Sequence, residues 1–62
     1  MNGNKVTCFD NSDPDDPIRL GIFNFYDISE GMIVEIDGQD WKVSDLIYMI
    51  SEKKSYAYLD LV

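Results

Sequence analysis

An Asp-Gly pair at residues 37 and 38 constrains this chain most, because the residues on both sides of it alternate between apolar and polar. A two-residue type I′ turn needs positive φ at both central positions, and Asp-Gly adopts it readily. The turn sets a register that pairs Ile36 with Gln39, Val34 with Trp41 and Met32 with Val43, so that apolar residues meet on one face. A slip of one residue would destroy that agreement. The sequence therefore predicts a β-hairpin here.

Three further segments have the composition or alternation of strands. They are residues 5–9, with Val6, Cys8 and Phe9 as candidate core residues, then residues 18–22, and finally residues 56–62. Residues 10–17 contain both prolines and many turn formers, so we expect an exposed acidic loop there. We expect residues 1–4 to be frayed.

Residues 44–53 fit two structures. As a strand over residues 46–50, followed by a four-residue loop at 52–55, they pair apolar with apolar: Ile50 with Ala57, Tyr48 with Leu59, and Leu46 with Leu61. As a helix, Ser44 would be the N-cap and the lysines at 53 and 54 would complement the dipole. Length and composition do not decide between the two; we favour the strand and leave the helix open.

These segments add up to four or five short strands in sequential order, in one domain spanning residues 1–62. We expect a small, mostly β fold, an antiparallel meander that closes into an SH3-like barrel. The alternative is an α+β fold, with residues 44–53 as a short helix on the sheet. Because a domain of this size buries a small core, an oligomer interface or a partner is expected to contribute to its stability.

The charge of the chain restricts its partners. It has 12 acidic residues, 5 basic residues and no histidine, giving a net charge of −7. Direct binding to nucleic acid or to an anionic membrane is disfavoured, since both need a positive surface. A protein with a basic surface, such as a nucleic-acid-binding protein, is the natural complement.

Residues suited to catalysis are scarce. The commonest general base, histidine, is absent, and Cys8 has no obvious activating neighbour except Lys5. We therefore expect no enzymatic activity and no cofactor. EF-hand spacing requires glycine at the sixth and glutamate at the twelfth position, and a loop starting at Asp13 has Ile18 and Asn24 there instead. We expect no metal site, although a loose calcium site in the acidic loop stays open.

Five acids outside the acidic loop are the first group of candidate binding residues. They are Asp27, Glu30, Glu35, Asp37 and Asp40. The hairpin register places Asp37 at the tip and Glu35 opposite Asp40. These carboxylates either keep the protein soluble and protect a sheet edge, or form a negative surface for a basic partner.

Aromatic residues are the second group. Tyr56 and Tyr58 alternate with Ala57 and Leu59, so we expect them on the face opposite the core, whereas Trp41 is expected inside it. That second face, which also carries Ile33, Ile47 and Met49, is either covered by residues 5–26 or serves as an interface. We include Tyr56 and Tyr58 among the partner-binding residues.

These observations predict a non-enzymatic binding protein, an inhibitor or adaptor that presents an acidic surface to a basic partner. The alternative is a structural module that forms homo-oligomers, such as a homodimer, through its apolar face. In size and charge the chain is similar to small phage-encoded proteins that block a host enzyme, which implies a site of action in the host cytoplasm. A cytoplasmic protein also fits the single cysteine, the lack of an apolar signal sequence in residues 1–9, and the lack of a membrane-spanning apolar run.

Overall fold

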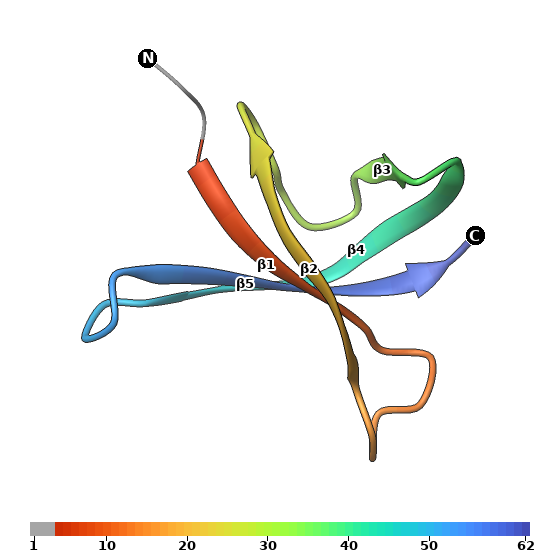
Figure 1. Cartoon of the computed structure of the whole chain (residues 1–62), viewed down its shortest axis with the longest axis horizontal. Helices are drawn as coiled ribbons and strands as arrows, with labels where there is room; N and C mark the ends of the chain where they lie inside the picture. The colour runs from red at the N-terminus through yellow and green to blue at the C-terminus, as the bar shows by residue number, and fades with distance from the viewer. Residues whose placement is uncertain (1–3) are drawn as a thin grey trace.

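The computed structural model describes residues 4–62, which form a single five-stranded sheet (Figure 1). The strands are β1 (Asn4–Asp10), β2 (Ile18–Phe25), β3 (Ile33–Ile36), β4 (Gln39–Met49) and β5 (Lys54–Leu61). Their order across the sheet is β2-β1-β5-β4-β3. The mostly β fold expected from the sequence is confirmed. Residues 1–3, expected to be frayed, lie outside the described residues, and Asn4 is already part of β1.

The β3–β4 hairpin has the turn and register that the sequence predicts. Asp37 and Gly38 have φ values of 52° and 80°, as a type I′ turn requires. Val34 pairs with Trp41 and Ile36 with Gln39. The pairing continues past β3, because the amide of Val43 donates to the carbonyl of Met32 at 2.8 Å.

Residues 44–49 are strand, so the helical alternative for residues 44–53 is wrong. The register with β5 differs from the predicted one by four residues, because Leu46 pairs with Ala57 and not with Leu61. The turn accordingly lies at residues 50–53, where Lys53 has a φ of 54°. A shift of four residues leaves every side chain on its original face, so alternation could not distinguish the two registers.

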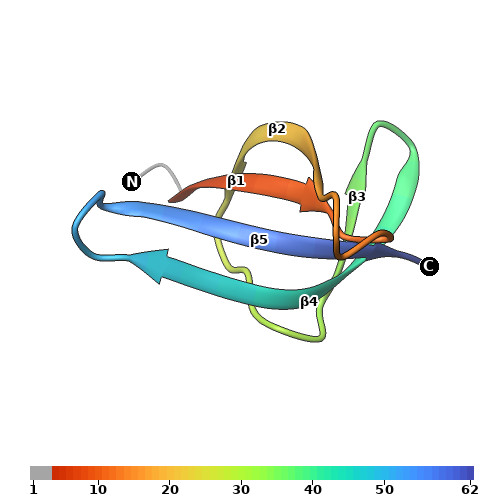
Figure 2. The ribbon, with the colours of Figure 1, turned by 90° about the horizontal axis from the view of Figure 1, so that it is seen from below.

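The sheet is mixed. Three neighbouring pairs are antiparallel, as in the expected meander, but β1 and β5 are parallel. Figure 2 shows β1, β5 and β4 running side by side. The edge strands β2 and β3 do not pair with each other, so the sheet curls into half of a barrel and stays open.

The core lies on the inner face of this curl. Its buried residues come from four strands, namely Val6, Cys8, Val34, Ile36, Trp41, Val43, Ala57 and Leu59. Leu20, Phe23, Phe25, Ile28 and Leu46 pack against them and remain partly exposed. The predicted core positions of Val6, Cys8 and Trp41 are confirmed, whereas Phe9 is only half-buried and lies on the outer face with Tyr56 and Tyr58.

The outer face is not covered by residues 5–26, contrary to one of the two expectations. Those residues contribute β1 and β2, which are strands of the same sheet. Within residues 4–62, therefore, no second layer lies over the outer face. Ile22 and Ile47 on this face are 54% and 41% exposed. The second expectation, that this face serves as an interface, stays a prediction.

Candidate binding surfaces

The acidic hairpin, defined as Glu35, Asp37 and Asp40, brings three of the predicted site residues together. Glu35 and Asp40 are direct cross-strand partners, and Asp37 occupies the adjoining turn. All three side chains are exposed. Their backbone is held by the buried side chains of Val34 and Trp41, so the three exposed carboxylates project from fixed backbone positions.

Asp27 and Glu30 lie elsewhere, in the connection between β2 and β3. Both residues are exposed. A carboxylate oxygen of Glu30, Oε2, accepts a hydrogen bond from the amide of Leu46 at 3.3 Å, which ties the connection to β4. Glu30 therefore has a structural contact of its own, and Asp27 and Glu30 do not belong to the acidic hairpin.

Tyr56 and Tyr58 lie on the outer face of β5, as predicted, next to Phe9 of the neighbouring strand β1. The ring of Phe9 stacks on Tyr58 with centroids 5.4 Å apart and lies 6.1 Å from Tyr56. The Tyr56 hydroxyl donates to Oε1 of Glu52 at 2.6 Å, and this hydrogen bond raises the pKa of Tyr56. The tyrosines thus share a surface with Phe9 and not with the acidic hairpin.

The acidic loop, residues 11–17, is exposed apart from the half-buried Asn11, and its carboxylates take part in turns. Asp10 accepts hydrogen bonds from the hydroxyl and the amide of Ser12, at 2.6 and 2.9 Å, and these bonds lower its pKa. The Oδ1 atom of Asp13 accepts a hydrogen bond from the amide of Asp15 at 3.2 Å. Within residues 4–62, no group of three or more Cys, Asp or Glu side chains is arranged to hold a metal ion.

Cys8 is fully buried in the core, and burial raises the pKa of its thiol to about 11. Its Sγ lies 3.8 Å from the carbonyl oxygen of Val6, a contact within its own strand. The thiol is therefore protonated near neutral pH, and a protonated thiol is a poor nucleophile.

Sequence reasoning missed a basic cluster on the outer face. Four of the five basic residues of the chain line one hollow of about 380 Å³: Lys5, Arg19, Lys53 and Lys54. These residues are scattered along the chain, so their proximity follows from the strand order. The sequence did contain a signal for the direction of one side chain. Lys5 alternates with the core residues Val6 and Cys8, which indicates that its side chain points away from the core.

Comparisons with protein-family models, with curated proteins and with solved structures gave no match. None of the described residues belongs to a helix long and apolar enough to cross a membrane.

Proposed function

We propose that this protein is a non-enzymatic binding protein whose acidic hairpin engages a basic surface of another protein. The observation that carries the proposal is the direct pairing of Glu35 with Asp40, next to Asp37. Like charges placed opposite each other destabilise a sheet. A partner that supplies lysine or arginine side chains relieves this repulsion. The carboxylate pair that destabilises the free protein therefore strengthens its binding to such a partner.

The type I′ turn makes the hairpin well suited to this role. Buried residues on one face of the hairpin fix its backbone, so the three acidic residues already lie close together before the partner arrives. Carboxylates in such a row imitate the phosphates of nucleic acid, so the basic groove of a nucleic-acid-binding protein is the natural target. The protein would act there as an inhibitor or adaptor in the cytoplasm, including a host cytoplasm if it is phage-encoded, and would need no cofactor.

The first test compares two variants that lose the same charge at different places. Glu35→Gln/Asp40→Asn neutralises the hairpin, whereas Asp15→Asn/Asp16→Asn neutralises two exposed loop residues. For a fluorescent oligolysine peptide at low salt, we expect the hairpin variant to bind about three- to tenfold more weakly and the loop variant to be close to wild type. Urea unfolding of the hairpin variant should show a gain of about 0.5 kcal/mol in stability, because the repulsion is removed.

Fluorescence anisotropy over a series of salt concentrations measures this binding. Equal weakening in both variants would mean that only net charge matters, which contradicts a site at the hairpin. An affinity that does not change between low and high salt would contradict the electrostatic basis of the proposal.

A second candidate function, homo-oligomerisation through the outer face, is favoured by one observation. Ile22, Ile47 and Met49 are exposed on that face, and no element of residues 4–62 covers them. Packing against a second copy would bury them, and a dimer would compensate for the small core.

A further inference from the structure

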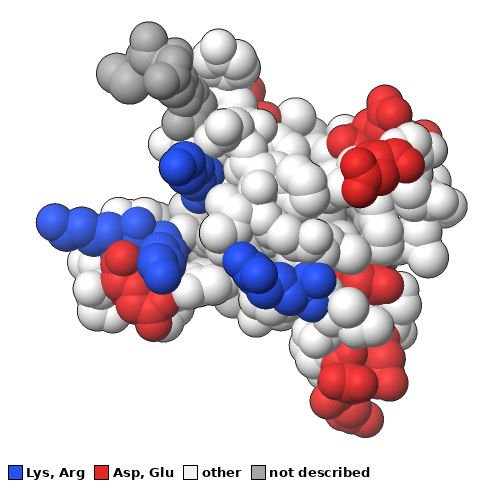
Figure 3. Space-filling model, in the orientation of Figure 1, with Lys and Arg blue, Asp and Glu red and all other residues white. Residues whose placement is uncertain are grey.

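The basic cluster, defined as Lys5, Arg19, Lys53 and Lys54, surrounds a hollow of about 380 Å³ on the outer face. None of the described residues that line this hollow carries a carboxylate. In a chain with 12 acidic residues, such a gathering of cations gives this surface a local charge opposite to that of the whole molecule. Figure 3 shows basic side chains on the face that carries β1 and β2, while the acidic ones visible in this view gather mainly at the right and lower right, with one acidic group beside the basic side chains at the left.

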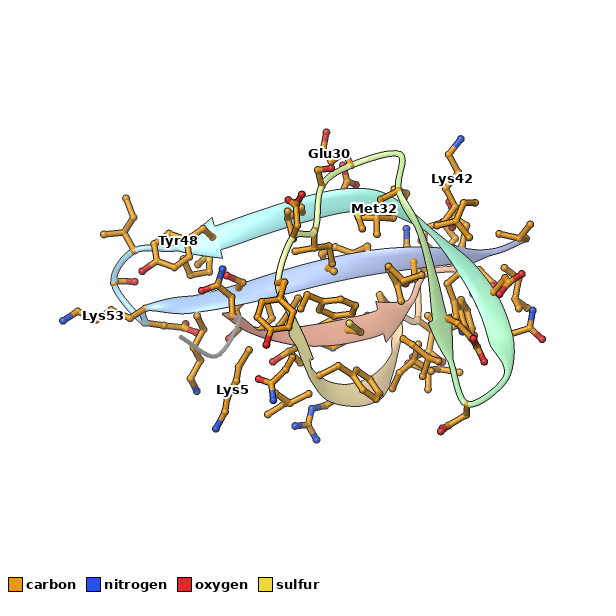
Figure 4. All side chains as sticks on the ribbon, turned by 90° about the horizontal axis from the view of Figure 1, so that it is seen from above. Lys5, Glu30, Met32, Lys42, Tyr48 and Lys53 are labelled. Atoms are coloured by element: carbon orange, nitrogen blue, oxygen red, sulfur yellow. The ribbon has the colours of Figure 1, made fainter. Side chains whose placement is uncertain are left out.

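Strand pairing accounts for the cluster. In the parallel β1–β5 pair, Val6 lies opposite Ser55, so the residues that precede them, Lys5 and Lys54, lie near the start of the two strands at the same end of the sheet. In the antiparallel β1–β2 pair, Phe9 lies opposite Arg19. Lys42 is the remaining basic residue, and Figure 4 shows it pointing away from Lys5 and Lys53 on the other side of the molecule.

Aromatic and hydroxyl side chains complete the lining of the hollow. Phe9 and Tyr56 contribute rings, and Thr7 and Ser55 contribute hydroxyl groups. Tyr58 stacks on Phe9 but does not line this hollow, whereas the Phe9 ring does. A planar ring that enters the hollow can therefore contact Phe9.

A second hollow of about 230 Å³ adjoins the first, and the two share Phe9 and Tyr56. It is lined by apolar and aromatic side chains, including Ile47 and Met49, together with Glu52. We call the two adjoining hollows, which meet at Phe9 and Tyr56, the track. Its first part is lined by the four cations and its second part mainly by apolar and aromatic side chains. Such a track suits a linear ligand that alternates anionic and planar apolar groups.

We propose that this track binds single-stranded nucleic acid, with phosphates among the cations of the basic cluster and a base against Phe9. Cations that follow a backbone, together with aromatic side chains that stack on bases, are the usual combination in proteins that bind single strands. Serine and threonine hydroxyls commonly donate to phosphate oxygens. Lysine is depleted in protein–protein interfaces, and three of the four cations here are lysines, which favours nucleic acid over an acidic protein segment.

This proposal modifies the expectation drawn from the net charge of −7. Charges farther away than about 8 Å are largely screened at physiological ionic strength, so the charge near the ligand decides. Neutralising four phosphates on a single strand predicts a slope of about −3 for log K against log salt. Binding is therefore expected to be weak at physiological salt and measurable at low salt.

The test uses a fluorescein-labelled oligothymidylate of about 12 nucleotides, within the range of known single-strand sites. Arg19→Gln/Lys54→Gln removes two cations of the cluster, and Lys42→Gln alters the one cation outside it. We expect the double variant to bind about tenfold more weakly and Lys42→Gln to bind within about twofold of wild type. Phe9→Leu should weaken binding about fivefold or more, whereas Tyr26→Leu, at an exposed position that does not line the track, should not.

Three results would overturn the proposal: absent binding of the oligonucleotide at low salt, equal weakening by Lys42→Gln and the double variant, or equally tight binding of an oligoglutamate peptide. Circular dichroism of each variant checks that its fold is intact. The hairpin variant Glu35→Gln/Asp40→Asn should retain oligonucleotide binding, since its changes lie outside the track. The two proposals can therefore fail independently of each other.

Discussion

At the scale of single residues, burial changes the chemistry of Cys8 most. Its side chain is inaccessible to solvent, and the loss of hydration disfavours the thiolate, which raises the pKa from 9.0 to about 11. No charged side chain is among the causes of this shift. Cys8 is therefore a core residue whose titration reports on whether the core is intact.

This titration predicts a loss of stability at alkaline pH. Between about pH 9 and 11 the unfolded chain releases the Cys8 proton while the folded chain retains it, so the free energy of unfolding falls as pH rises. The expected slope is about 1.4 kcal/mol per pH unit at most. Urea unfolding at several pH values measures it, and Cys8→Ala serves as the control because it lacks the thiol. Identical pH profiles for wild type and Cys8→Ala would contradict this account.

At the scale of elements, the β3–β4 hairpin depends on its two turn residues. Gly38 has a φ of 80°, and a Cβ built there would meet no other atom within 4 Å. The glycine is thus needed for its backbone conformation and not for lack of space.

Gly38→Ala should destabilise the protein by about 1–2 kcal/mol, the cost of holding an L-residue in the left-handed region. Asp37→Asn is the matched change at the neighbouring position, and it should change stability by less than about 0.5 kcal/mol, because asparagine tolerates a positive φ. Urea midpoints for the two variants measure the difference. A Gly38→Ala variant as stable as the wild type would mean that the type I′ turn does not limit stability.

At the scale of the whole molecule, charge is divided between surfaces. The acidic hairpin and the acidic loop carry negative charge, while the outer face holds a cluster of cations around one hollow. A dimer made face to face through this surface would bring two such clusters together, and their repulsion opposes the gain from burying Ile22 and Ile47.

We therefore expect a monomer of 7.1 kDa at micromolar concentration. Analytical ultracentrifugation at low and high salt measures the mass. A dimer at both salt concentrations, abolished by Ile47→Asp but not by Ile50→Asp in the exposed β4–β5 turn, would favour the assembly function over the binding functions.

The sequence by itself determined the local structure of this protein. Asp37 and Gly38 fixed the hairpin turn, and alternation around them placed Val34 and Trp41 inside and Glu35 and Asp40 outside. These are short-range effects, since turn conformation and side-chain direction depend on neighbouring residues. The acidic hairpin could be predicted for the same reason, because all three of its members lie in one short segment, residues 35–40, that contains the turn.

Only the tertiary structure decided which strands are neighbours. The β4–β5 register, the parallel pairing of β1 with β5 and the open outer face follow from packing between distant segments, which alternation does not encode. The basic cluster depends on that pairing, because it joins Lys5 to Lys54 across almost the whole chain. The charge of the chain was a sum over residues, whereas the charge that a ligand meets is set by the arrangement of the strands.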